Sequence, residues 1–324
     1  MKFRGNIQAP PGNGLVPISH YLSGSKPQKP NIMHGFDLEN ALIPSEDIQS
    51  GGHGKDDIPA IDTPIFKRAV DYSFFEDDTF VLGITHRGVA KAYPLPILNW
   101  HEIVNDFVDT VPIVVTYCPL CSCGMIYESN IGGTRAAFGV SGLLYQSNLL
   151  MYDRRSESLW SQITGKAVSG PLSGQKLKPL STHLTTLGAW KREHPETLIL
   201  TTRTGFVRNY QQSAYQEYDN DQQLYYTPWN TNDLLPAKER VIGVQVGDHV
   251  KAYPFAELAS HPELIIRDTF KGKPLHIHYD VLNDVASVTD EEGKVYPSKT
   301  MYWFAWYAFH PKTAVYLVSA KKGS

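Results

Sequence analysis

The sequence contains little cysteine: three residues among 324. An odd number of cysteines lying close together does not resemble the even, spaced framework of a disulfide-rich secreted protein. The chain also lacks an apolar run of about 18 residues, so we expect no membrane-spanning helix. Its first residues have no apolar core of a signal peptide. We therefore expect a cytoplasmic protein, or an exported one if a leader peptide was removed.

The chain has no strong charge of either sign. The formal net charge is -3, which gives no electrostatic reason to expect nucleic acid as a partner. A hydrophobic fraction of 42% supplies enough apolar material for one large domain or two medium ones. The expected partner is a small-molecule substrate, and the sequence does not indicate the oligomeric state.

The cysteines are Cys118, Cys121 and Cys123, and we call them the thiol cluster. They follow the apolar stretch 113–117, which predicts a buried strand. Thiols at a strand end can share a metal ion or a redox electron pair, although small buried cysteines can also simply pack. A structural zinc site needs four ligands, whereas copper(I) accepts two or three thiolates. A dithiol switch needs only Cys118 and Cys121, but the thioredoxin-type motif opens a helix, and here the run continues toward a strand.

A second group of polar residues precedes the thiol cluster. His101 is a candidate fourth ligand, and Glu102, Asn105 and Asp106 could orient a ligand by hydrogen bonding. The alternative is that Glu102 and Asp106 cap or solvate the end of a short helix over residues 94–102.

A polar segment follows the thiol cluster and is dense in small and hydrogen-bonding side chains. Such a segment can position a substrate beside a thiolate site, or it can form ordinary hairpin turns. The candidate substrate-binding residues are Tyr117, Ser141, Tyr145, Asn148, Trp160 and Gln162.

The chain contains an internal repeat. The tetrapeptides VLGI at 81–84 and KAYP at 91–94 recur as VIGV at 241–244 and KAYP at 251–254. Trp190 with HPET at 194–197 and Trp306 with HPKT at 310–313 form a later matching pair. Matches in the same order at both ends indicate duplication of a whole unit.

The two copies differ at the thiol cluster. In the repeat register, Cys118 matches Asp280 and Cys121 matches Asn283, and most of residues 133–187 has no counterpart in the second copy. A metal ion needed for folding would be expected in both copies. The absence of the thiols from one copy therefore favours a functional site on a fold that is stable without a metal.

The predicted fold class is mainly β, an α+β fold with few short helices, internally duplicated into two related strand-rich halves. We predict an irregular N-terminal arm over 1–60, copy one over 61–204, an aromatic connecting loop over 205–238 and a shortened copy two over 239–320. The connecting loop is either a linker or an ordered loop that covers a cleft.

Four motifs resemble an uncharacterised family, the domain of unknown function 3179: NWHEIVND at 99–106, YCPLC at 117–121, FGVSGLLY at 138–145 and LWSQ at 159–162. The similarity extends from about residue 58 to about residue 318. The family brings no established activity, and many members look exported. The resemblance implies that Cys118 and Cys121 belong to the common pattern. Members usually carry Ser or Thr at the position of Cys123, so the resemblance favours Cys118, Cys121 and His101 over three thiolates.

Our leading hypothesis is a metal-dependent oxidoreductase that acts on a small molecule. Cys118, Cys121 and His101 would be both catalytic and metal-binding, with Cys123 a further candidate ligand and copper the expected metal. Zinc and iron are the alternatives. The competing functions are a metal-binding or copper-delivery protein without turnover, and a thiol–disulfide redox protein.

Overall fold

The computed structural model describes residues 32–263 and 265–318, and it confirms a mainly β fold with short helices. Copy one contains β5 (Phe80–His86), β6 (Val89–Pro94), α1 (Leu95–His101), β7 (Ile103–Val108), β8 (Val111–Cys118), β9 (Cys123–Glu128), β16 (Pro179–Leu180), β17 (His183–Thr186), α2 (Leu187–Glu193) and β18 (Leu198–Leu200). Copy two contains β19 (Arg240–Val246), β20 (His249–Pro254), α4 (Phe255–Ser260), β21 (Ile265–Phe270), β22 (Lys273–Asp280), β23 (Val285–Thr289), β24 (Ser298–Tyr302), α5 (Trp303–Phe309) and β25 (Ala314–Val315).

The internal duplication is confirmed by the strand order. In copy one the order is β17-β5-β6-β18, with β4 (Phe66–Arg68) added at the edge, and in copy two it is β24-β19-β20-β25. The last pair is parallel in both copies. A second sheet also recurs, as β9-β8-β7 in copy one and β23-β22-β21 in copy two.

The repeated glycine and tryptophan pack together in each copy, although the motifs that contain them lie far apart in sequence. A Cβ atom on Gly83 would lie 2.6 Å from the Trp190 ring, and one on Gly243 would lie 2.1 Å from the Trp306 ring. Each indole nitrogen donates to a threonine hydroxyl after the helix, Thr197 at 2.8 Å and Thr313 at 2.9 Å. The glycine therefore lets the helix of each copy pack directly on its sheet.

The polar segment of copy one folds as an additional sheet. Its strands are β12 (Phe138–Tyr145), β13 (Asn148–Asp153), β14 (Leu159–Ser161) and β15 (Ala167–Ser169), preceded by the hairpin of β10 (Asn130–Ile131) and β11 (Thr134–Arg135). Part of the arm predicted over 1–60 lies outside the described residues. The rest includes β1 (Ile32–Met33), β2 (Phe36–Asp37) and β3 (Ile48–Ser50), and β3 pairs with β12 at the edge of this sheet.

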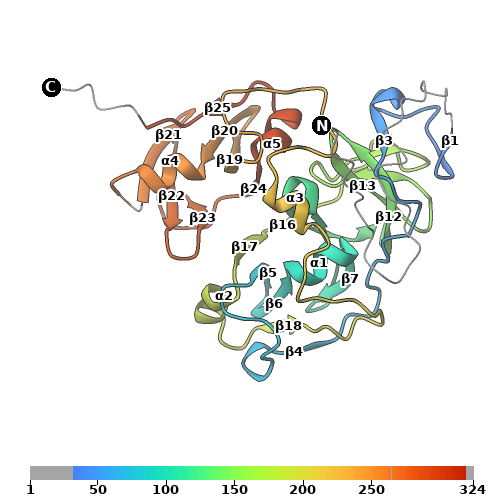
Figure 1. Cartoon of the computed structure of the whole chain (residues 1–324), viewed down its shortest axis with the longest axis horizontal. Coiled ribbons are helices and arrows are strands. Elements are labelled where there is room, and N and C mark those ends of the chain that lie inside the picture. The colour runs from blue at the N-terminus through green and yellow to red at the C-terminus, as the bar shows by residue number, and fades with distance from the viewer. Residues whose placement is uncertain (1–31, 264, 319–324) are drawn as a thin grey trace, which may run out of the picture.

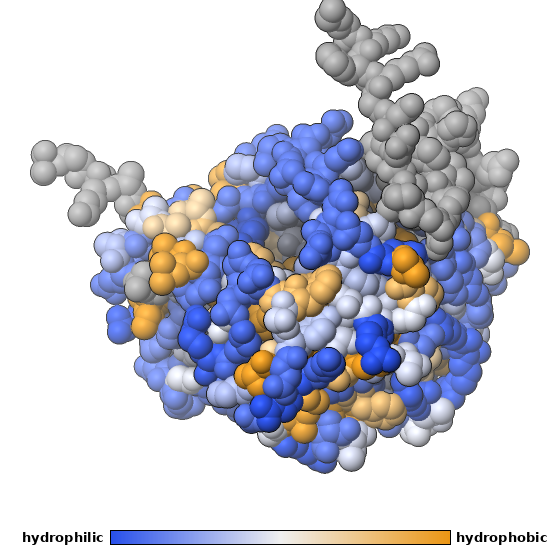
Figure 2. All heavy atoms as spheres, turned by 60° about the horizontal axis from the view of Figure 1, so that its bottom comes forward, coloured by the Kyte–Doolittle hydropathy of each residue, from blue (hydrophilic) through white to orange (hydrophobic). Residues whose placement is uncertain are grey.

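The two copies contact each other reciprocally. Strand β24 of copy two packs against β9 of copy one, and β17 of copy one packs against β23 of copy two. The five larger sheets are arranged like the blades of a propeller (Figure 1). On the face shown in Figure 2, polar side chains predominate and apolar ones form small patches. No helix within residues 32–263 and 265–318 is long and apolar enough to cross a membrane.

Candidate functional site

The thiol cluster lies at the tip of the β8–β9 hairpin. Cys118 ends β8 and Cys123 begins β9, and the two residues are direct partners in the ladder. A single 3-10 turn, Pro119–Cys121, joins the strands, and Ser122 follows it in the left-handed conformation with φ of 49°. All three thiols are buried, and none of them forms a disulfide. The tight turn therefore brings the thiols together inside the protein core.

The polar segment supplies the hydrogen-bonding environment of Cys121. Its thiol donates to the carbonyl of Ser147 at 3.3 Å, and the Asn148 amide donates to the sulfur at 3.6 Å. Asn148 also donates to Gln162 at 2.9 Å, and Gln162 donates to the backbone carbonyl of Cys123 at 3.0 Å. The Oδ1 atom of Asn148 is buried without a hydrogen-bond partner. This segment, which copy two lacks, thus surrounds the thiols with polar groups that are not all satisfied.

Burial keeps the Cys121 and Cys123 thiols protonated in the absence of a metal. It raises the pKa of Cys121 well above its ordinary value, and the neighbouring thiol of Cys118 raises it further. Burial also raises the pKa of Cys123 to about 12, although the Lys299 ammonium acts in the opposite direction. A thiolate at this site therefore needs a positive charge to stabilise it.

The connecting loop covers the thiol cluster. It contains α3 (Gln216–Asn220), and the Tyr218 hydroxyl donates to the carbonyl of Leu120, within the thiol turn, at 2.9 Å. Ser147 donates to the carbonyl of Tyr226, whose own hydroxyl is buried without a partner. Sequence reasoning noted the aromatic density of this loop but did not identify Tyr218 or Ser147 as its anchors. The loop closes the site from solvent.

Glu102 lies under the same loop. It is buried in the left-handed conformation at the end of α1, and the Tyr215 hydroxyl donates to its carboxylate at 3.0 Å. Burial raises the pKa of Glu102 to about 7, and the hydrogen bond from Tyr215 limits the increase. Glu102 is thus a carboxyl group that can gain or lose a proton near neutral pH.

Both ring nitrogens of His101 form hydrogen bonds outside the thiol cluster. Its Nδ1 lies 2.7 Å from the Pro59 carbonyl and its Nε2 lies 2.7 Å from the Tyr210 hydroxyl. Burial lowers the pKa of His101 to about 4, so the ring is neutral at pH 7. Within the part of the chain that the structure describes, no three His, Cys, Asp or Glu side chains are grouped to hold a metal. Metal binding by His101 would therefore require one of its hydrogen bonds to break.

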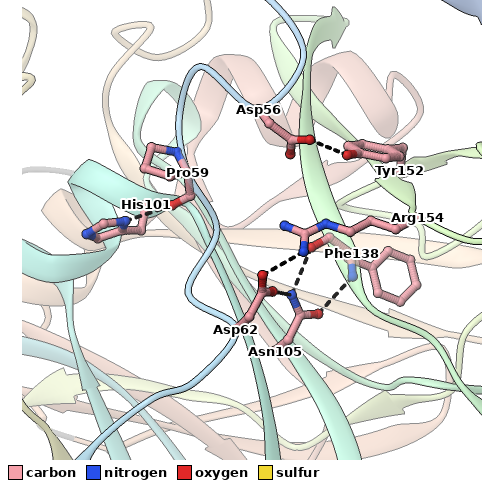
Figure 3. A network of polar contacts seen from close by, with 8 residues as sticks. All are labelled: Asp56, Pro59, Asp62, His101, Asn105, Phe138, Tyr152 and Arg154. Carbon is pink, nitrogen blue, oxygen red and sulfur yellow. Dashed lines mark hydrogen bonds and ion pairs between the residues drawn. The ribbon is translucent and has the colours of Figure 1, made fainter. Parts of the chain in front are cut away.

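Asn105 connects the segment around Asp62 to the inserted sheet, as Figure 3 shows. Its amide nitrogen donates to Asp62 and to the Phe138 carbonyl, and its oxygen accepts from the Phe138 backbone nitrogen at 2.8 Å. Asp62 also pairs with Arg154 at 2.6 Å. Both the nitrogen and the oxygen of the Asn105 amide are hydrogen-bonded in this way. Asn105 therefore joins the segment around Asp62 to the inserted sheet and forms no hydrogen bond with a thiol.

Asp106 belongs to a network that both copies share. It accepts hydrogen bonds from Lys91 and Tyr93, each at 2.7 Å, and Asp268 of copy two makes the equivalent contacts with Lys251 and Tyr253. Because copy two has no thiols, this network stabilises the repeated scaffold.

The predicted substrate-binding residues separate into two groups. Tyr117, Asn148 and Gln162 lie beside the thiol cluster. Ser141 donates to the Leu150 carbonyl and Trp160 donates to Asp153, so both are used within the inserted sheet. Tyr145 packs edge-on against Phe309 of α5. Substrate binding by the first group stays a prediction.

The comparisons with known proteins give a family. The model of the family described as "Protein of unknown function (DUF3179)" matches residues 55–313, and the chain belongs to this family. No curated protein and no solved structure matches the chain significantly.

Proposed function

We propose that this member of the DUF3179 family is a metal-dependent oxidoreductase in which Cys118 and Cys121 hold one copper(I) ion. The observation that carries the proposal is the contact between these two buried thiols at the tip of the hairpin. Soft thiolate ligands select copper(I), and two of them suffice without a histidine. His101 is left out of the proposed ligand set because both its ring nitrogens are already hydrogen-bonded.

The electrostatics of the site favour a bound cation over a free thiolate. The raised pKa of Cys121 opposes ionisation unless a metal replaces the proton. Asn148 would then donate a hydrogen bond to the Cys121 sulfur and orient it, as hydrogen-bonding partners of metal ligands commonly do. Copper would supply one-electron chemistry, and Glu102, with a pKa of about 7, would supply or accept protons nearby.

The enclosure of the thiols argues against a copper carrier. A carrier has to pass its metal to another protein, which requires exposed ligands. Here the connecting loop lies over the turn that holds Cys121, and its Tyr218 donates a hydrogen bond to that turn. The same enclosure disfavours thiol–disulfide exchange, because that reaction needs an accessible thiol with a lowered pKa.

Copper(I) loading of the anaerobic protein tests the proposal. The protein should retain about one copper(I) per chain against a competing chelator, and Cys118→Ser or Cys121→Ser should abolish retention. Cys123→Ser is the matched control and should retain the metal. Equal retention by all four proteins would exclude this site, and rapid transfer to the chelator from an intact site would favour the carrier.

A further inference from the structure

A cavity lies where the two copies meet. It has a volume of about 710 Å³ and is lined by β9 and β17 of copy one and by β23 and β24 of copy two. Its size falls in the range of small-molecule pockets. None of the three cysteines lines it, although the charge of Lys299 on its wall acts on the pKa of Cys123.

Equivalent positions of the two copies face this cavity with different chemistry. His183 pairs with Gly83 in copy one, and Lys299 pairs with Gly243 in copy two. The repeat therefore places a lysine at the position where the other copy has a histidine. Burial lowers the pKa of His183, so the imidazole at this position of copy one is neutral at pH 7. The fold therefore does not require a positive charge at the equivalent position of copy two.

Lys299 lacks a protein counter-ion. Its ammonium donates to the carbonyl of Ile163 at 2.9 Å, and within residues 32–263 and 265–318 no carboxylate forms an ion pair with it. An ammonium has three donors, so donors are left for a ligand. Burial lowers the pKa of Lys299. The thiol of Cys123 acts in the opposite direction, and Lys176, a second cation of the cavity wall, lowers the pKa further.

The acidic residues of the cavity wall do not balance this charge. The Glu193 side chain is 73% exposed and lies 3.9 Å from His194. Asp280 accepts hydrogen bonds from the backbone nitrogens of Leu282 and Asn283, at 3.0 and 3.2 Å. The cavity therefore presents a cation to its interior, and a partly buried cation is most stable when an anion accompanies it.

The remaining walls combine polar side chains, such as His278 and His310, with apolar ones. Trp190 and Trp306, which are equivalent in the two copies, both line the cavity, together with Met125, Ile242 and Val288. Apolar surfaces of this kind favour flat aromatic or aliphatic groups.

We propose that this cavity binds a small organic anion, a carboxylate with an aromatic or apolar body, whose anionic group contacts Lys299. The carboxylate accepts hydrogen bonds from the ammonium, and the body packs against Trp306 and Trp190. The site does not depend on copper binding at Cys118 and Cys121.

Equilibrium dialysis with naphthoate and with its neutral amide, naphthamide, tests the proposal on the full chain. Naphthoate should bind at one site and about tenfold more tightly than the amide, because a charge-assisted hydrogen bond replaces a neutral one. Lys299→Met should remove this preference. Lys67→Met, which changes an exposed lysine outside the cavity, should keep it.

A second variant locates the binding independently of the charge. Ser287 is exposed on β23 and lines the cavity, so Ser287→Trp should fill the space and weaken binding of both compounds. Equal affinity for acid and amide, a preference that survives in Lys299→Met, unchanged binding to Ser287→Trp or the absence of saturable binding would each overturn the proposal.

Discussion

Cys118 and Asp280 occupy the same position in the two copies, the last residue of β8 and of β22. Cys118 pairs with Cys123 across its hairpin, and Asp280 pairs with Val285 across the equivalent one. The Asp280 carboxylate accepts hydrogen bonds from the backbone of the turn that follows it. The repeated fold therefore closes this hairpin without a thiol, which indicates that the fold itself does not require the thiols of copy one.

The lysine–aspartate network should be a main source of stability in each copy. Asp106→Ala would leave the Lys91 ammonium, which is largely buried, without its counter-ion. We expect a loss of about 3 kcal/mol in the free energy of unfolding, measured with urea. Asp268→Ala should cost less because Lys251 and Asp268 are more exposed.

Asp71→Ala provides the control for this series. It removes an exposed ion pair with Arg68 and should change the free energy of unfolding by less than about 1 kcal/mol. If Asp106→Ala cost no more than Asp71→Ala, the network would not stabilise the scaffold.

Glu102 should make stability depend on pH. The folded protein holds the Glu102 proton up to a pKa of about 7, whereas the unfolded chain releases it near 4.5. The unfolded state therefore binds fewer protons between these values, and the contribution of Glu102 to stability falls as pH rises from 4.5 to 7. The full penalty above pH 7 is about 3 kcal/mol.

Glu102→Gln should remove this penalty while it keeps an acceptor for Tyr215. We expect the variant to gain stability over the parent protein at pH 8 and to gain little at pH 4.5, as measured by urea unfolding. Glu196→Gln alters an exposed carboxylate and should show no such difference. A constant difference between Glu102→Gln and the parent across this pH range would mean that the carboxyl is not perturbed by burial.

The connecting loop should control access to the thiols. Tyr218→Phe removes the hydrogen bond from the loop to Leu120 and should make local opening about fivefold more frequent, since such a bond contributes about 1 kcal/mol. Labelling of the native protein by a thiol reagent should accelerate by the same factor. Tyr72→Phe removes a hydroxyl contact with Thr202, outside the loop, and should leave the rate unchanged. Identical labelling rates in all three proteins would show that the loop is not the barrier.

The repeat could be predicted from sequence because its markers are residues that the fold cannot easily replace. Gly83 and Gly243 have no room for a side chain, and the adjacent tryptophans need the threonines that accept their hydrogen bonds. The position of the thiols at a strand end followed in the same way from the apolar run before Cys118.

The surroundings of the thiols could not be predicted in the same detail. His101 and Asp106 are close to the thiol cluster in sequence, but the hydrogen bonds that define them run to Tyr210 and Lys91. The loop contact of Tyr218 joins residues 98 positions apart, and no local pattern indicates such a pairing. The sequence did not identify Lys299 as a binding residue, because the cavity that it lines is formed only when the two copies pack together.

Metal analysis combined with a thiol count on protein purified without air is the most direct test of copper binding by Cys118 and Cys121. The expected result is about one copper per chain, with two of the three thiols protected until a chelator removes the metal and loss of both effects in Cys118→Ser. Less than about a tenth of an equivalent of any transition metal, with three reactive thiols after unfolding, would contradict it.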